Sequence, residues 1–260
     1  MIRPGLCSIT FRDLTAEQLI DLARRAGLAC IEWGGDVHAP PGDTETAERV
    51  RLLTEQAGLS VASYGSYLRF TGDNASHRAD ADAVLASARA LHAPRIRVWA
   101  GGTGSRRTPT PLRAQAARRI REFATRAGEH GIDLGLEFHR GTLTDEIGST
   151  MRLLDEVAAD NVRTYWQPHQ DMPDDDALQT LRTALPRTST IHVFSWWPGA
   201  SRLPLAERAD LWCAAFSILE AEGSDRDALL EFVPNDDPAV LDREAATLRE
   251  LIEDGRASTP

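Results

Sequence analysis

The segment 132–140 reads Ile132-Asp133-Leu134-Gly135-Leu136-Glu137-Phe138-His139-Arg140, a short apolar run that leads to an acidic residue. The polar turn Gly141-Thr142-Leu143-Thr144 follows it. A strand that is buried on both faces reads as a near-continuous apolar run, so a carboxylate at its end lies where the sheet stops and a loop begins. We therefore expect Glu137 to face a site at the end of a buried strand.

Four further segments repeat this pattern along the chain. Each is a short apolar run with a polar, metal-capable side chain near its carboxyl end, and amphipathic helical patterns separate the runs. A barrel of alternating strands and helices collects such side chains at one end to form its active site. The segments are 30–33, 163–167, 190–194 and 228–232.

Eight predicted strands alternate with eight predicted helices over the 260 residues. The first helix is the clearest, because Thr15 with Gln18 three residues later forms a capping box and an apolar stripe runs from there to Gly27. The strands are expected at 5–10, 29–33, 59–64, 95–99, 132–138, 162–167, 188–194 and 228–232. Together with the lack of a linker, this predicts a single-domain α/β protein, a (β/α)8 TIM barrel over residues 1–254 with a frayed tail over 255–260.

The composition excludes several classes of protein. No apolar run is long enough for a membrane span, and the N-terminus lacks the core of a signal peptide, so we expect a cytoplasmic protein with no membrane partner. The net charge of −10 opposes binding to nucleic acid. The three cysteines lie far apart and favour reduced thiols over a disulfide framework or a zinc motif.

The chain contains no lysine, and all 29 basic residues are arginine. This composition excludes Schiff-base chemistry, a Walker-A phosphate loop and any mechanism that needs an amine nucleophile. The glycine-rich loop 100–107 does not fit the dinucleotide fingerprint, so we expect a mobile lid loop there rather than a phosphate site.

Candidate functional side chains are those at the predicted strand ends and in the loops beyond them. Glu137, His192 and Glu231 lie on the fifth, seventh and eighth predicted strands, and Gln167 lies on the sixth. Carboxylate and amide oxygens with one imidazole suit a hard or borderline divalent ion, whereas a structural zinc site would show clustered cysteines. The candidate set is Glu32, His38, Glu137, His139, Gln167, His169, His192 and Glu231.

At these residues the sequence resembles the xylose-isomerase-like TIM-barrel superfamily of sugar isomerases, epimerases and related dehydratases. The resemblance rests on segments 31–34, 136–139, 165–167, 191–193 and 230–232 in the expected order, with His38 after the first. In that family a glutamate, an aspartate, a histidine and a glutamate on strands five to eight hold a metal. The resemblance implies one divalent metal ion, Mn²⁺ with Mg²⁺ or Co²⁺ as alternatives, bound by Glu137, Gln167, His192 and Glu231.

Gln167 departs from the family pattern, because many members have an aspartate at this position. With two glutamates, a neutral amide and a neutral imidazole, the four ligands carry a formal charge of −2 instead of −3. An amide oxygen still ligates, but the lost charge should weaken binding and make the bound ion a stronger Lewis acid. A decayed metal site is the alternative interpretation.

The resemblance also implies a type of chemistry. A divalent ion that chelates a carbonyl and its neighbouring hydroxyl acidifies the adjacent C–H bond and stabilises an enediolate, while a carboxylate on each face moves the proton. Glu137 and Glu231 are therefore predicted to be catalytic residues as well as ligands. The enediolate can be protonated at either carbon, it can be protonated with inversion at one carbon, or it can expel a β-leaving group. Isomerase, epimerase and dehydratase reactions therefore share one site.

Other side chains near the strand ends are expected to contact a small sugar-like substrate. Aromatic residues recur there and predict a stacking wall, although Glu32 could instead be an ion-pair partner and Arg202 a solvated surface residue. His169 is either a substitute ligand or a loop residue. Arg97 lies within a buried strand, so it must pair with a barrel carboxylate or an anionic substrate. The predicted substrate-binding residues are Glu32, Trp33, His38, Trp99, His139, Trp166 and Arg202.

Three functions compete for this site. The first is a metal-dependent isomerase or epimerase of a sugar, keto-sugar or polyol-derived substrate. The second is a lyase that acts on a keto-sugar or inosose by elimination, and the third is a non-catalytic sugar-binding barrel with a decayed metal site. Apurinic-site endonucleases share the barrel but need a histidine-rich multi-metal site and a basic face, which seven histidines and a charge of −10 oppose. The helix faces leave the oligomeric state open, with a homo-oligomer as one alternative.

Overall fold

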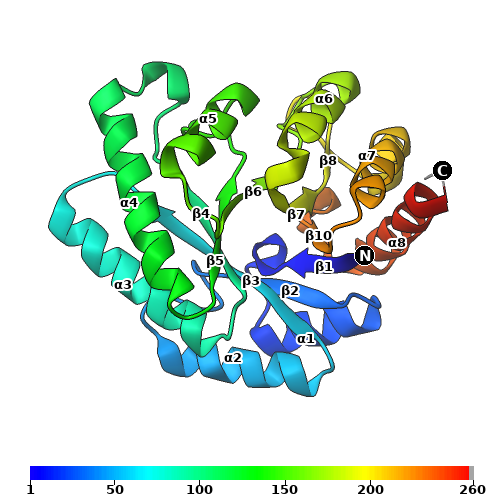
Figure 1. Cartoon of the computed structure of the whole chain (residues 1–260). Helices are drawn as coiled ribbons and strands as arrows, with labels where there is room; N and C mark the ends of the chain where they lie inside the picture. Colours follow the sequence, from blue (N-terminus) through cyan, green and yellow to red (C-terminus); the bar gives the residue numbers. More distant parts are fainter. Residues whose placement is uncertain (258–260) are drawn as a thin grey trace.

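Eight parallel strands close into a barrel in the computed structural model, which describes residues 1–257 (Figure 1). The strands follow one another around the barrel in chain order, and β1 closes the ring against β10, with Leu6 opposite Leu230. The barrel strands are β1 (Ile2–Cys7), β2 (Cys30–Gly34), β3 (Ser60–Arg69), β4 (Arg95–Trp99), β5 (Asp133–Glu137), β6 (Val162–Trp166), β7 (Thr188–Val193) and β10 (Arg226–Leu230).

Eight α-helices of the described chain surround these strands (Figure 1). None of them is both long and apolar enough to cross a membrane. A short antiparallel hairpin of β8 (Ser195–Trp196) and β9 (Arg202–Leu203) follows β7. The predicted single-domain (β/α)8 TIM barrel is confirmed. The helices are α1 (Ala16–Arg25), α2 (Thr44–Gln56), α3 (Asn74–Ala90), α4 (Thr110–Gly128), α5 (Ile147–Val157), α6 (Asp174–Ala184), α7 (Ala209–Glu222) and α8 (Leu241–Ala257).

The start of α1 illustrates how local sequence specifies the helix ring. The Thr15 side chain accepts a hydrogen bond from the backbone N–H of Gln18, and the Gln18 side chain accepts one from the backbone N–H of Thr15. This predicted capping box satisfies two backbone donors that would otherwise lack a partner at the helix terminus. Leu19 and Ala23 of the same helix are fully buried, so its apolar face packs onto the barrel.

The main apolar core lies between the strands and the helices, and a separate small apolar cluster lies inside the barrel. Two charged layers lie on either side of the strand residues of this inner cluster, while Ile9 of the 3-10 helix after β1 lines the pocket of the candidate site. Asp227 with Arg3 and Arg95 forms one layer toward the amino ends of the strands, and the candidate site forms the other toward their carboxyl ends. The inner cluster consists of Cys7, Ile9, Cys30, Ala62 and Leu229.

Two strand glycines make room for large side chains inside the barrel. A Cβ on Gly65 of β3 would lie 2.8 Å from Oε1 of Glu32 and 2.9 Å from Nη2 of Arg97. A Cβ on Gly135 of β5 would lie 2.1 Å from the ring of Tyr165. A larger residue at either position would displace these side chains, which explains glycine within a strand.

The first and third strands differ from the prediction. β1 begins at Ile2, and a 3-10 helix, η1 (Ser8–Phe11), replaces the end of the strand expected at 5–10. β3 extends beyond the predicted end at residue 64, because Gly65 pairs with Arg97 of β4 and Arg69 pairs with Trp99. Backbone pairing with a neighbouring strand therefore orders a segment whose aromatic composition suggested a loop.

The C-terminal helix is also longer than expected. α8 reaches Ala257, so residues 255–257 are helical rather than part of the frayed tail predicted over 255–260. Gly255 packs tightly on α7, where an added Cβ would lie 2.6 Å from Cβ of Phe216. This close packing holds the last turn against its neighbour. Residues 258–260 of the predicted tail lie outside the described residues.

We expect Asp227→Asn to destabilise the protein by about 3 kcal/mol, because breaking a buried ion pair leaves the partner charge uncompensated. Asp227 is buried and accepts from Arg3 at 2.8 Å and from Arg95 at 2.7 Å. Asp225→Asn is the matched control and should change little, since Asp225 is exposed and pairs with the N-terminal amine. Urea unfolding measures both variants, and equal midpoints would contradict a stabilising role for the layer around Asp227.

Candidate active site

Glu137 at the end of β5 is held by three hydrogen-bond donors. Its Oε2 accepts from Nη1 of Arg97 at 3.0 Å and from Nε1 of Trp99 at 2.5 Å. Its Oε1 accepts from Nε2 of Gln167 at 3.2 Å. Arg97 and Trp99 are two residues apart on β4, so both side chains lie on the inner face of the barrel. The Glu137 carboxylate is therefore oriented before any ligand binds.

Gln167 bridges two of the predicted metal ligands. Its Nε2 donates to Glu137, and its Oε1 lies 2.8 Å from Nδ1 of His192, which can donate to it. Nδ1 of His192 also lies 3.6 Å from Oε2 of Glu231. All four side chains are buried. The structure thus brings Glu137, Gln167, His192 and Glu231 together in one contiguous cluster.

Glu32 of β2 joins this cluster beside His192. Its Oε1 lies 3.4 Å from Nε of Arg97 and 3.5 Å from Nε2 of His192. Its Oε2 accepts a hydrogen bond from Oγ of Ser63 at 2.6 Å, and Sγ of Cys7 lies 4.0 Å from Oε1. Arg97 therefore pairs with two barrel carboxylates, Glu32 and Glu137, which is the first of the two arrangements expected for this buried arginine.

Burial and charge oppose each other in the cluster. Burial disfavours the charge on Glu32, but Arg97 and His192 outweigh it and lower the pKa of Glu32 to about 2. Burial also disfavours the charge on His192, yet Glu231 and Glu32 raise the pKa of His192 to about 9. Burial raises the pKa of Glu231 to about 7, against the attraction of His192. In the metal-free protein at neutral pH, His192 is therefore a cation placed among carboxylates.

These residues fit a divalent metal ion. One ligand atom each from Glu137, His192 and Glu231 lie within 4.8 Å of one another. Oε1 of Gln167 adds an amide oxygen next to His192. Two carboxylates, an amide oxygen and an imidazole form a donor set suited to Mn²⁺, Mg²⁺ or Co²⁺. The buried cluster could therefore hold one divalent ion.

A pocket of about 270 Å³ adjoins the cluster, and Arg97, Glu137, Gln167 and Glu231 line part of it. Aromatic side chains form much of the remaining wall, and guanidinium groups lie over two of them. Arg202 lies 4.7 Å and Arg12 lies 5.9 Å from the ring centre of Phe232, while Arg69 lies 4.6 Å from that of Trp99. The aromatic wall consists of Tyr67, Trp99, Phe194, Trp196 and Phe232.

His139, for which substrate binding remains a prediction, lines the same pocket. Its ring stacks on Trp99 with a centroid distance of 4.5 Å, and its Nδ1 lies 2.7 Å from the backbone O of Arg140. A carbonyl oxygen only accepts, so Nδ1 carries a proton and donates it. Within residues 1–257, Nε2 of His139 makes no hydrogen bond, so in the neutral ring this nitrogen is an available proton acceptor.

Two predicted substrate-binding tryptophans do not reach the pocket. Nε1 of Trp33 donates to Oγ1 of Thr54 on α2, and Nε1 of Trp166 donates to Oγ1 of Thr180 on α6. Both rings are fully buried between strand and helix. The prediction was wrong for both, because the residue next to an inward-facing side chain on a strand faces outward.

His38 and Glu32 also lie outside the pocket. The ring nitrogens of His38 lie 3.0 Å from Oγ of Ser8 and 3.0 Å from the backbone O of Leu14, so this histidine supports the loop after β2. Glu32 is only 1% exposed and reaches the cluster from within the barrel. Substrate contact by either residue was the wrong prediction, since other protein groups already surround both side chains.

The remaining candidates take supporting positions. Arg202 stacks on Trp196 and Phe232 and pairs with Asp236, so it braces the aromatic wall. Nε2 of His169 lies 2.9 Å from the backbone O of Asp145, which places this histidine in the loop structure rather than among the ligands.

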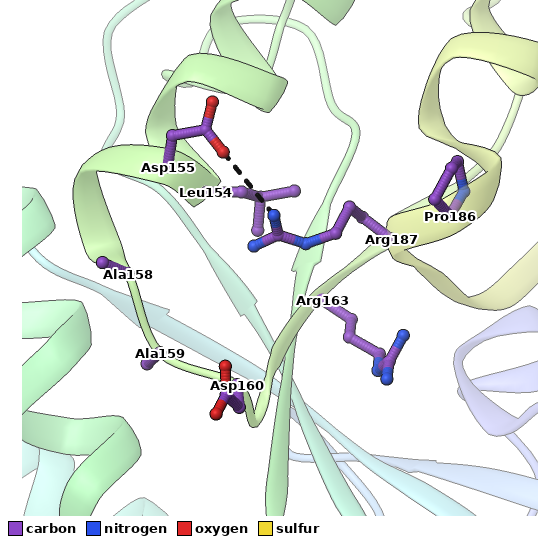
Figure 2. A pocket seen from close by; sticks show the side chains of 8 residues that line it. All are labelled: Leu154, Asp155, Ala158, Ala159, Asp160, Arg163, Pro186 and Arg187. Atoms are coloured by element: carbon purple, nitrogen blue, oxygen red, sulfur yellow. Dashed lines mark ion pairs between the residues drawn. The ribbon is translucent and has the colours of Figure 1, made fainter.

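A larger groove of about 640 Å³ lies near the amino ends of β6 and β7 (Figure 2). Arg163 lies at the start of β6 and Arg187 just before β7, and Figure 2 shows the ion pair between Arg187 and Asp155. In TIM barrels the catalytic groups come from the carboxyl ends of the strands, whereas the amino ends contribute stability. The groove is therefore on the structural side of the barrel, and the smaller pocket is the candidate active site.

Comparison with known proteins identifies the family of this chain. The family model described as the xylose isomerase-like TIM barrel matches residues 20–251. The chain belongs to this family. The resemblance seen in the strand-end residues is thereby confirmed over most of the chain.

Individual relatives of this xylose isomerase-like barrel include both dehydratases and epimerases. A 3-dehydroshikimate dehydratase from Bacillus anthracis is 28% identical over 194 residues, which cover 68% of this chain and 67% of that protein. The solved structure of a probable 3-DHS dehydratase from the same organism has a TM-score of 0.79 at 23% identity and covers 96% of this chain and 99% of its own. An L-ribulose 3-epimerase structure has a TM-score of 0.73 at 19% identity, covering 99% of this chain and 95% of its own.

Sequence reasoning missed Ser63, Arg12 and Phe232. Ser63 could have been found, because alternation along β3 turns it to the same face as Gly65. No comparable signal identifies the other two, whose contacts depend on loop conformation: Nη2 of Arg12 donates to Oη of Tyr67 at 2.9 Å, and Phe232 adopts a left-handed φ of 56°. That conformation is rare for a bulky residue and is typical of functional sites.

We expect Gln167→Glu to strengthen metal binding and weaken the metal-free fold. The new carboxylate has the same length as the amide and adds a charge beside the ion, which should raise Mn²⁺ affinity roughly tenfold. Without metal, it loses the hydrogen bond to Glu137 and places two carboxylate oxygens about 3.2 Å apart, a cost of about 2 kcal/mol that a stronger hydrogen bond with the His192 cation offsets only in part. Calorimetric titration and thermal unfolding with and without EDTA measure the two effects.

The control for this variant is Gln170→Glu, which adds the same charge at another residue lining the pocket. Within the described residues, no hydrogen bond joins the Gln170 side chain to the four ligands, so both measurements should stay near the unsubstituted protein. Equal responses of the two variants would contradict ligation by Gln167.

We expect metal affinity to rise with pH. A ligating imidazole must be neutral, and the pKa of His192 near 9 in the metal-free protein means that metal displaces a proton below that pH. The affinity should therefore rise by about tenfold per pH unit between pH 7 and 9, and more steeply below pH 7, where Glu231 is also protonated. Calorimetric titration with metal in buffers of different ionisation enthalpy gives the number of protons released. A metal affinity that does not change with pH would exclude His192 as a ligand.

Proposed function

We propose that the chain is a metal-dependent lyase that removes water from a hydroxylated cyclic ketone bearing a carboxylate. This proposal depends mainly on the position and contacts of His139. Its Nδ1 donates to a backbone carbonyl, its ring is stacked on Trp99, and the residue lines the pocket together with Glu137, with no hydrogen bond to its Nε2 in the described residues. An oriented imidazole with a ring nitrogen free of hydrogen bonds, next to a metal site, is suited to removing a proton from carbon.

The pocket walls support a flat ring as the substrate. Five aromatic side chains line a volume of about 270 Å³, which fits a small six-membered ring better than a long polar chain. Arg12 lines the same pocket and Arg202 lies against its aromatic wall. Each is paired with an aspartate, Asp36 or Asp236, with which a substrate carboxylate would compete. The name of the Bacillus anthracis relative, a 3-dehydroshikimate dehydratase, agrees with this substrate class.

The metal proposed for the site is Mn²⁺, with Mg²⁺ or Co²⁺ as alternatives, held by Glu137, Gln167, His192 and Glu231. When bound, the ion would stabilise negative charge that develops on the ketone oxygen of the substrate. The protein supplies the remaining parts. Arg97 and Trp99 keep the Glu137 carboxylate oriented, and the aromatic wall excludes water from the ring.

The proton transfers then follow from the position of His139. Its Nε2 takes a proton from the carbon next to the ketone, and the C–H electron pair forms the enolate. The enolate electrons form a new C=C bond and expel the hydroxyl group from the neighbouring carbon. The imidazolium returns its proton to the departing oxygen, so one water leaves and His139 regains its neutral form.

We expect the Mn²⁺-loaded protein to dehydrate 3-dehydroshikimate, and His139→Gln to lower kcat by about 10²-fold or more while metal binding is retained. Loss of water gives a dienone, which becomes aromatic when a ring C–H proton moves to the ketone oxygen. The aromatic product is followed by ultraviolet absorption and NMR. His169→Gln is the control, because His169 contacts the loop at Asp145 rather than the pocket. A variant at His139 with unchanged kcat, or an inactive protein with bound metal, would contradict the proposal.

A second candidate is the isomerase or epimerase that the sequence pattern favoured first. Glu137 and Glu231 reach the same cluster from different strands, an arrangement that would allow proton transfer on two faces of a substrate carbon. Deuterium uptake from D₂O into a keto-sugar, without loss of water, would support this function over elimination.

A further inference from the structure

The His192 imidazole contacts the protein through both ring nitrogens. On one edge, Nδ1 lies 2.8 Å from Oε1 of Gln167 and 3.6 Å from Oε2 of Glu231. On the other edge, Nε2 lies 3.5 Å from Oε1 of Glu32. Nδ1 therefore faces the predicted ligands, and Nε2 faces a carboxylate that is not one of them.

Glu32 is fixed from several directions. Oγ of Ser63 donates to its Oε2 at 2.6 Å, and Nε of Arg97 lies 3.4 Å from its Oε1. The side chain is 1% exposed, and Gly65 leaves only enough room for it and Arg97. A carboxylate held in this way cannot swing into the pocket, so its available acceptor is directed at His192.

Nε2 of His192 is a buried polar atom that faces this carboxylate, and it lacks a well-formed hydrogen bond in the described residues. A separation of 3.5 Å is long for a charge-assisted hydrogen bond, which usually measures 2.7–2.9 Å. A small rotation of the ring toward Glu32 would shorten it.

We infer that Glu32 is a positioning residue for the metal site, which holds the Nε2 proton of His192 and thereby presents the Nδ1 lone pair to the ion. A ligating histidine generally donates its other ring N–H to a carboxylate or carbonyl, which fixes the tautomer and increases the basicity of the ligand. Arg97 extends the same arrangement, since it joins Glu32 to the ligand Glu137. Two ligands on β5 and β7 are thus oriented through one buried chain of contacts.

This inference rests on the proposed metal site but not on the reaction that the site performs. The direct test is NMR of the Mg²⁺-loaded protein labelled with ¹⁵N-histidine, because ring nitrogen shifts report which nitrogen carries the proton. Nε2 of His192 should be protonated and Nδ1 unprotonated. A proton on Nδ1, or a metal ion on Nε2, would overturn the inference without any substitution.

The second test is Mn²⁺ affinity of Glu32→Gln, which keeps the size of the side chain and removes its charge. Loss of such a carboxylate partner should weaken binding by about 10–100-fold. Glu244→Gln is the matched control, since Glu244 is also buried but accepts from the backbone N of Leu205 at the outer helices. Its affinity should equal that of the unsubstituted protein.

The possible results distinguish the existence of the metal site from the role of Glu32 in it. Absence of bound metal in the unsubstituted protein would refute the metal site and this inference with it. Bound metal with equal affinity in Glu32→Gln and the unsubstituted protein would refute the inference alone. If Glu32→Gln does not fold, the NMR measurement on the unsubstituted protein decides the question.

Discussion

The buried guanidinium of Arg97 is the constraint on which the site depends. A charge removed from water is tolerated only when it is paired, and Arg97 is paired with Glu32 on one side and with Glu137 on the other. The three charges hold one another in a space that Gly65 keeps open. The orientation of Glu137 is therefore a property of the barrel itself and does not wait for a metal ion to impose it.

The polar interior also constrains the register of the strands. A slip of β4 by one residue would turn Arg97 toward the helices and bring Val98 into the charged layer, since successive side chains alternate between faces. The same holds for β2, where Glu32 faces inward and Trp33 packs outward against α2. Charged layers at both ends of a small apolar cluster therefore specify one pairing of the strands, where a uniformly apolar interior would tolerate several.

The strand order predicted that polar side chains at the strand ends would meet, because the carboxyl ends of parallel strands converge at one end of a barrel. The family resemblance singled out Glu137, Gln167, His192 and Glu231 among them. The direction of single side chains was less predictable. Trp33 and Trp166 stand next to inward-facing residues, so nearness to a strand end was a poor guide to their position. The contact between Phe232 and Thr10, which are 222 residues apart, depends on the path of two loops and has no counterpart in a local pattern.

Residues of the barrel strands orient the buried charges of the site, whereas residues outside these strands form most of its aromatic wall. Arg97 and the residues it orients belong to strands whose register the whole barrel maintains, whereas Phe194, Trp196 and Phe232 belong to segments beyond the barrel strands, Trp196 within the β8–β9 hairpin. Side chains in such segments can change without disturbing the hydrogen bonds of the barrel. Selection for a new substrate can therefore act on the aromatic wall while the buried charges remain as they are, which makes this barrel a favourable starting point for evolving specificity in the laboratory.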